Sequence, residues 1–198
     1  MNTDPFEKPM VVECTSGSSL TAEDLQTIAR DLEHTPYIAY FPDKAWRSMR
    51  ELYVARVDEK LVGLLALVNL GANWVEIGPF LIIRNYPKAM RADTAFKLLS
   101  SAVRGIGGRN AFWTSHNPIV KRLAARLPEF EPISVTQSCL IPAVLLRHLR
   151  VLALNLTVES AAVRKRKKNL GGAETGDAFF VRYANRRNTG NKRSDRSP

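Results

Sequence analysis

The sequence predicts a mixed α/β (α+β) fold, with a central sheet flanked by helices and a basic C-terminal extension. Hydrophobic residues make up 45% of the 198 residues and charged residues 24%, which is typical of a globular soluble protein. Three β-type runs follow one another in residues 51–83, and helical and β-type segments alternate after them. Adjacent strands with interleaved helices indicate one mixed sheet and not a repeating βαβ barrel.

The N-terminal part is predicted to be helical after a polar lead-in at residues 1–11. Residues 19–34 form the first expected helix, because Thr21 is placed to cap it and apolar residues recur at helical spacing from Leu25 to Leu32. Residues 44–52 are expected to form a second short helix.

Residues 51–69 have the pattern of a tight β-hairpin with its turn at residues 57–60. Its second run is apolar almost throughout, as in a strand that is covered on both faces. A third strand is expected at residues 73–84, with Gly78 and Pro79 in its middle. Because proline cannot donate a ladder hydrogen bond, a bulge or an opening of the sheet is predicted there.

The second half alternates between helices and strands. After residue 83 we expect a loop that becomes a helix in residues 84–108, a strand at 110–116 and a helix at 117–130. A strand at 134–142, a helix in the first half of 143–168 and a last strand at 176–185 are expected to follow. The predicted organisation is a domain over residues 1–150, a C-terminal helix and last strand in 151–185, and a disordered basic tail in 186–198.

The positive charge is concentrated at the C-terminal end. The formal net charge is +10, and residues 151–198 carry +7 of it. The charge is densest in five consecutive cations, Arg164, Lys165, Arg166, Lys167 and Lys168. Such a run is typical of a site that binds nucleic acid or a nucleoprotein particle, or of a helix end that only improves solubility.

Several classes of protein are excluded. No apolar run approaches the roughly 18 residues that span a bilayer, so we expect no membrane partner. The N-terminus does not resemble a signal peptide, which favours a cytoplasmic protein with reduced thiols. Cys14 and Cys139 are far apart, and the three histidines are scattered, so no metal site is expected.

Three segments resemble the GNAT-type N-acyltransferases. They are the hairpin YVARVDEKLVGLLALV, the strand VEIGPFLII and the segment HNPIVKRLAARLPEF, and the similarity covers roughly residues 51–130. The resemblance implies a GNAT-like, mostly antiparallel mixed sheet and transfer of an acetyl or other acyl group from acyl-CoA to an amine, without a metal. It also implies that the fourth strand of the family's sheet separates from the fifth and that the pantetheine arm of CoA lies between them.

In this family the CoA pyrophosphate binds backbone N–H groups of a loop that opens a helix. By the resemblance, the cofactor-binding residues are Ile82, Ile83, Lys88, Ala89, Met90, Arg91, Ala92, Asp93 and, at the later strand–helix junction, Asn117. The family loop reads Q/R-x-x-G-x-G/A, whereas residues 85–93 contain no glycine. Lys88 and Arg91 add positive charge, so the anion site is either retained in altered form or lost. Asp93 also fits the N-cap of the following helix.

The resemblance also suggests catalytic residues. Glu76 lies where the family often has a general base, although it could instead lie on the solvent face of its strand. Ala124 stands where many members have a tyrosine that protonates the leaving thiolate. The remaining candidates are Ser115, His116 and Asn117, and His116 could equally be a capping or surface residue.

Two functions are therefore compatible with the sequence. The first is an acyl-CoA-dependent N-acyltransferase, favoured by the order of elements and by Lys88 and Arg91. The second is a catalytically degenerate GNAT-fold binding or assembly protein that attaches through its basic C-terminal region to nucleic acid or to a large nucleoprotein or viral particle. The glycine-free loop and the missing tyrosine favour the second function.

Overall fold

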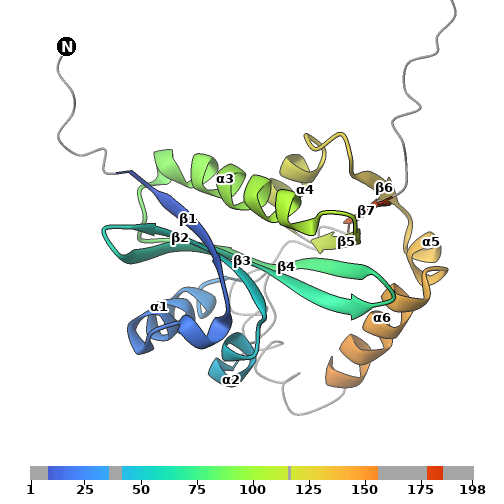
Figure 1. Cartoon of the computed structure of the whole chain (residues 1–198), viewed down its shortest axis with the longest axis horizontal. Coiled ribbons are helices and arrows are strands. Elements are labelled where there is room, and N and C mark those ends of the chain that lie inside the picture. Colours follow the sequence, from blue (N-terminus) through green and yellow to red (C-terminus); the bar gives the residue numbers. More distant parts are fainter. Residues whose placement is uncertain (1–8, 36–41, 116, 156–177, 185–198) are drawn as a thin grey trace, which may run out of the picture.

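A computed structural model describes residues 9–35, 42–115, 117–155 and 178–184 (Figure 1). Its centre is a seven-stranded sheet in the order β1-β2-β3-β4-β5-β7-β6. Within the described residues, β4 and β5 are the one parallel pair, and the other neighbouring strands are antiparallel. The predicted mixed α+β fold with a mostly antiparallel sheet is confirmed.

The elements have the following bounds. The strands are β1 (Val11–Thr15), β2 (Glu51–Val57), β3 (Lys60–Gly71), β4 (Trp74–Ile82), β5 (Asn110–Ser115), β6 (Glu131–Ile133) and β7 (Ala178–Arg182). The helices are the short 3₁₀ helix η1 (Gly17–Ser19), α1 (Ala22–Leu32), α2 (Asp43–Arg47), α3 (Lys88–Ile106), α4 (Pro118–Ala124), α5 (Val135–Cys139) and α6 (Pro142–Asn155).

Local sequence signals explain α1 and the hairpin that follows it. The Thr21 hydroxyl accepts a hydrogen bond from the N–H of Asp24, and the Asp24 carboxylate accepts one from the N–H of Thr21, each at 3.0 Å. This reciprocal pair satisfies donors that the first helical turn leaves unpaired. The β2–β3 turn places Asp58 and Glu59 at φ of 50° and 62°, as two-residue hairpin turns require.

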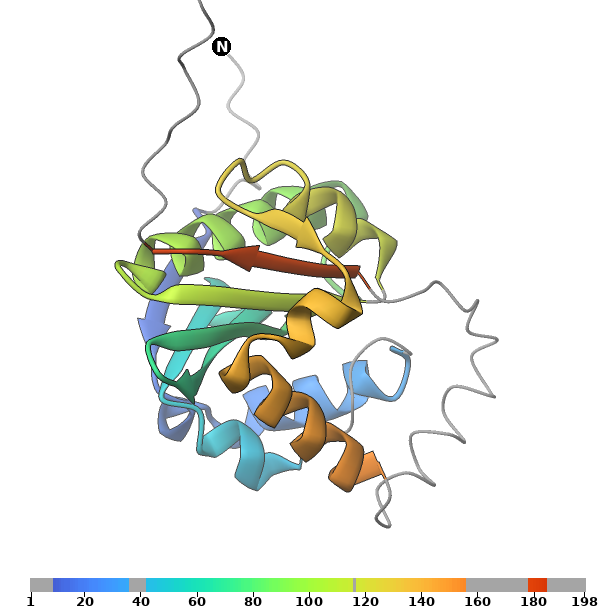
Figure 2. The ribbon, with the colours of Figure 1, turned by 90° about the vertical axis from the view of Figure 1, so that its right-hand side faces the viewer.

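Helices cover both faces of the sheet (Figures 1 and 2). On one face, α3 and α4 pack on a core that includes Leu65, Ile77 and Leu98. On the other face, α1 and α2 pack near β2 and β3, and α6 lies over β5 and β7. β3 is therefore buried on both sides, as its apolar run predicted.

The structure differs from the predicted elements at residues 134–142 and at β1. Residues 134–142 are not a strand, because they form α5 and the start of α6, and the short strand β6 lies just before them. The Ser134 hydroxyl accepts from the N–H of Gln137, whose side chain accepts from the N–H of Ser134. This capping box starts a helix in spite of the β-type composition. β1 (Val11–Thr15) starts at the last residue of the expected lead-in, and no element was predicted for the rest of this strand.

β7 confirms the last strand, which was expected in residues 176–185. It lies between β5 and β6 and pairs with both, so the end of the described chain completes the sheet. The division at residue 150 stays a prediction. The expected tail at residues 186–198 lies outside the described residues, as does the second half of the segment 143–168.

Replacing Gly105 by Ala tests the contact between α3 and β2. A Cβ atom at Gly105 would lie 1.6 Å from the hydroxyl oxygen of Tyr53, whose ring is buried. Alanine favours a helix by about 1 kcal/mol over glycine, but overpacking a core costs about 1–3 kcal/mol. We expect denaturant unfolding to show a net loss of stability. Gly108→Ala is the control, because nothing lies within 4 Å of a Cβ there, and an equal effect of both substitutions would contradict the close packing.

Candidate functional site

A bulge interrupts β4 at Gly78 and Pro79, as the sequence predicted. Leu67 of β3 pairs with Ile77, and Leu65 pairs with Phe80, so β4 contains one residue more than β3 over this stretch. Gly78 has a φ of 135°, a conformation that favours glycine because it has no Cβ. The bulge therefore redirects β4 in the middle of the sheet.

β4 and β5 separate at the same place. Their parallel pairing joins Trp74–Ile77 to Asn110–Trp113 and ends there. β5 continues to Ser115, but its last residues pair with β7 and not with β4. Beyond Ile77, β4 thus has a strand partner only on its β3 side among the described residues. Its backbone groups on the other side lack the hydrogen bonds that a neighbouring strand would make.

Glu76 lies next to this opening and is held by an arginine. Arg147 of α6 donates to Oε1 of Glu76 from Nε at 2.9 Å and from Nη2 at 2.5 Å. Only 15% of the Glu76 side chain and 19% of the Arg147 side chain is exposed. The Arg147 guanidinium also lies 5.9 Å from the ring centroid of Phe112. The alternative that Glu76 lies on a solvent face is therefore wrong.

The start of α3 differs from the expected loop. The helix begins at Lys88 with Pro87 as its N-cap, so Asp93 is not the cap but lies within the helix and pairs with Lys97. Met90 donates its N–H to the carbonyl of Pro87, and Pro87 has no N–H. A helix start leaves its first four backbone N–H positions without partners inside the helix. At α3, this leaves the N–H groups of Lys88 and Ala89 as possible donors to a ligand.

The side chain of Arg91 closes the β4–α3 loop (residues 83–87). Its Nε donates to the carbonyl of Tyr86 at 2.8 Å, and its Nη2 donates to the carbonyl of Arg84. Asp31 of α1 accepts the N–H of Arg84 at 2.8 Å. Burial raises the pKa of the Asp31 carboxyl group, and the hydrogen bond from Arg84 opposes that rise. Side chains, not glycines, therefore fix this loop.

The predicted cofactor-binding residues lie at one end of the sheet. Ile82 and Ile83 lie at the end of β4, and the others of this stretch, Lys88, Ala89, Met90, Arg91, Ala92 and Asp93, form the first turns of α3. Asn117 caps α4 just after β5, where its side chain accepts the N–H of Ile119 at 2.9 Å. Because β4 and β5 are parallel, their carboxyl ends reach the same edge of the sheet.

Other predicted residues lie outside the described part of the chain. They are the catalytic candidate His116 and the nucleic-acid-binding candidates Arg164, Lys165, Arg166, Lys167 and Lys168. Their roles stay predictions. Conversely, no sequence pattern indicated a role for Arg147, which lies 71 residues from Glu76 along the chain.

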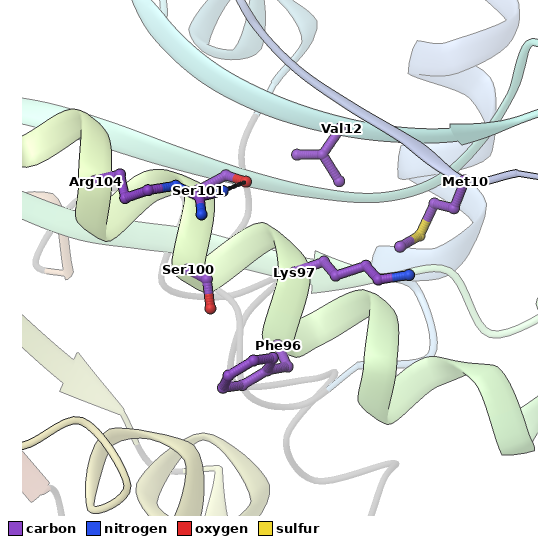
Figure 3. Close-up of a pocket in the computed structure, with 7 residues that line it drawn as sticks. All are labelled: Met10, Val12, Phe96, Lys97, Ser100, Ser101 and Arg104. Carbon is purple, nitrogen blue, oxygen red and sulfur yellow. Dashed lines mark hydrogen bonds between the residues drawn. The ribbon is translucent and has the colours of Figure 1, made fainter.

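Two hollows lie near α3. One, of about 630 Å³, lies between α1 and the β4–α3 loop and includes Arg30, Asp31, Arg84 and Arg91 in its lining. The other, of about 440 Å³, lies between β1 and the outer face of α3, where Met10, Phe96 and Arg104 contribute to its lining (Figure 3). Only the first adjoins the end of β4.

Within the described ranges, no group of three or more histidine, cysteine, aspartate or glutamate side chains is arranged to hold a metal ion. The described helices also include none with the length and apolar character that crossing a membrane requires.

Comparisons with protein-family models and with curated proteins find no match. Solved structures do match. N-acetylglutamate synthase from Neisseria gonorrhoeae, complexed with CoA and N-acetyl-glutamate, aligns with a TM-score of 0.53 and 17% identity over 91% of this chain and 36% of that chain. A CoA complex of a Mycobacterium tuberculosis protein aligns with a TM-score of 0.54 and 14% identity over 87% and 98% of the two chains. An aminoglycoside 6'-acetyltransferase type Ii aligns with a TM-score of 0.52 and 10% identity over 89% and 99%.

The chain thus spans about a third of the Neisseria synthase and nearly the whole of the other two proteins. At these identities the similarity concerns the fold. The bulged β4, its separation from β5 and the order of the elements agree with it. We conclude that the chain is a divergent protein with the fold of the GNAT-type acetyltransferases.

Proposed function

We propose that the protein is an acyl-CoA-dependent N-acyltransferase. The observation that carries this proposal is the separation of β4 from β5 beyond Ile77 and Trp113. A sheet normally satisfies its backbone groups through neighbouring strands, and a strand that leaves its neighbour offers the same groups to an extended ligand. The amide-containing pantetheine arm of CoA is such a ligand, and the two matched structures with CoA support the assignment.

In this proposal, the pantetheine arm binds the β5-facing backbone of residues 78–82, and its thioester lies near the bulge. Bound acyl-CoA supplies an activated acyl group. The amine nitrogen forms a bond to the acyl carbon, the carbon–sulfur bond breaks, one amine proton goes to a base, and the sulfur leaves as a thiolate that takes up a proton. The products are an amide and free CoA.

Glu76 is the proposed base, because it lies two residues before the bulge and is the acid nearest to it in the strand. Arg147 donates to its Oε1 from both Nε and Nη2. Ser115 is the proposed proton donor for the thiolate, directly or through water. Its Oγ accepts the N–H of Asn117 at 3.0 Å, which leaves the hydroxyl proton to donate at the end of β5.

Acetyl-CoA should stabilise the folded protein. At about 100 times its dissociation constant, a ligand that binds only the native state adds roughly 2.7 kcal/mol to the free energy of unfolding. Thermal melting with and without acetyl-CoA measures this effect. ATP at equal concentration and ionic strength is the control, because a chain of net charge +10 attracts polyanions in general. An unchanged melting temperature, or equal shifts with both compounds, would overturn the proposed function.

A further inference from the structure

We propose that arginine side chains in the hollow between α1 and the β4–α3 loop bind the phosphate groups of acyl-CoA. This inference rests on the proposed function and adds a phosphate site that differs from the glycine-loop pattern. The proposed phosphate-binding residues are Arg30 of α1 and Arg84 of the β4–α3 loop. Arg91 of α3 is the positioning residue that holds this loop.

The helix start offers little to a phosphate. Pro87 and the Met90–Pro87 hydrogen bond leave the N–H groups of Lys88 and Ala89 at this end of α3. Side chains also surround these groups, because no glycine lies in residues 85–93. Backbone N–H groups therefore cannot wrap a pyrophosphate here in the way that a glycine-rich loop does.

The hollow next to the helix start supplies positively charged side chains in place of backbone N–H donors. Its volume of about 630 Å³ is in the range of small-ligand sites. Arg30, Arg84 and Arg91 reach it from three elements, against the acids Asp31 and Glu33, which gives a formal charge of +1 with histidine neutral. The planar guanidinium group offers paired donors that match phosphate oxygens.

Existing contacts set the roles of the three arginines. Arg91 is committed to the carbonyls of Arg84 and Tyr86, so it maintains the loop. The Arg84 side chain makes one long contact of 3.4 Å with the carbonyl of His34. Arg30 makes two contacts within its own helix, to the carbonyl of Gln26 at 3.3 Å and to the hydroxyl of Thr27 at 3.2 Å. Both side chains belong to exposed residues. These two guanidinium groups can therefore turn toward a ligand.

Asp31 fixes the position of Arg84. It is 7% exposed, and its Oδ1 accepts the N–H of Arg84. Since this bond involves the backbone, it persists when the Arg84 side chain is removed. A substitution at Arg84 thus removes a charge without releasing the loop from α1.

Calorimetry with CoA and with dephospho-CoA tests the inference on the full chain. We expect Arg30→Ala and Arg84→Ala each to weaken CoA binding about tenfold, as the loss of a charge-assisted hydrogen bond does. The arginine that contacts the 3'-phosphate should show a smaller loss with dephospho-CoA. Arg104→Ala, which removes an exposed arginine at the far end of α3, should leave the affinity unchanged, and melting curves verify that the variants fold.

The outcomes separate the two proposals. If the unmodified protein binds no CoA, the proposed function fails and this inference fails with it. If CoA binds but Arg30→Ala and Arg84→Ala behave like Arg104→Ala, the function stands and the arginine site is wrong. If Lys88→Ala alone abolishes binding, the phosphates lie at the start of α3, which also overturns the arginine site.

Discussion

Glu76→Gln should lower the rate of acyl transfer by about 10²–10⁴-fold, which is the usual contribution of a positioned base. Glutamine keeps the shape of the side chain and removes its basicity, so CoA affinity should change little. High pH should restore part of the rate, because the acceptor amine then loses its proton in solution. The measurement is thiol release from acetyl-CoA with L-glutamate, an aminoglycoside and a lysine-containing peptide as trial acceptors.

The ion pair with Arg147 requires matched controls for this experiment. Removing one partner of a buried pair costs about 3–5 kcal/mol, and replacing both by apolar or neutral groups costs much less. Arg147→Met should therefore destabilise the protein, and Glu76→Gln combined with Arg147→Met should recover most of the loss. If the double variant is stable and still slow, the loss of rate belongs to Glu76. Full turnover by Glu76→Gln in a protein that binds CoA would show that Glu76 is not the base.

The largest loss of stability is expected from Asp24→Ala. Arg56 of β2 donates to both carboxylate oxygens of Asp24, at 2.9 and 2.7 Å, and 5% of the Asp24 side chain is exposed. Its removal takes away the close carboxylate partner of Arg56, which keeps the longer ion pair to Glu13 at 3.7 Å and the bond to the carbonyl of Glu59. It also removes half of the α1 capping box, for a total loss of about 3–5 kcal/mol. Urea unfolding measures this loss, with Glu23→Ala as the control in the same helical turn.

Low pH should reduce the difference in stability between the unmodified protein and Asp24→Ala. Burial alone would raise the pKa of Asp24, but the hydrogen bonds from Arg56 and Thr21 outweigh burial and lower the pKa below its ordinary value. A lowered folded-state pKa means that the stabilisation is present above the ordinary carboxyl range and is lost as the pH falls through the folded value. The stability gap between the unmodified protein and Asp24→Ala should therefore narrow below about pH 4. A gap that stays constant, or an effect no larger than that of Glu23→Ala, would rule out the ion pair as its cause.

The parts of the fold that the sequence predicted correctly depend on local signals. Thr21 and the apolar spacing after it determine α1, and the proline at residue 79 indicates the bulge, because each acts within a few residues. Composition was misleading at residues 134–142, where apolar and β-branched residues suggested a strand and the Ser134–Gln137 capping box determines a helix. The start of α3 was placed too late for a similar reason, since Asp93 has the chemistry of a cap but lies inside the helix.

The candidate site was predictable only in part. Glu76 and the Gly78–Pro79 bulge both lie in β4, so the sequence of this one strand was enough to predict both. Arg147 reaches Glu76 from α6, and Asp31 reaches Arg84 from α1. These contacts depend on how the helices pack on the sheet, so the pattern of residues within one segment cannot predict them.

Amide hydrogen exchange with and without CoA tests the central claim most directly, because it reports which backbone groups the ligand covers. We predict slower exchange in peptides that contain residues 78–83 and 113–115, where β4 and β5 separate. Peptides from β1 and the β2–β3 turn, on the far side of the sheet, should exchange at unchanged rates. Binding of CoA in calorimetry without protection of residues 78–83 would contradict the account.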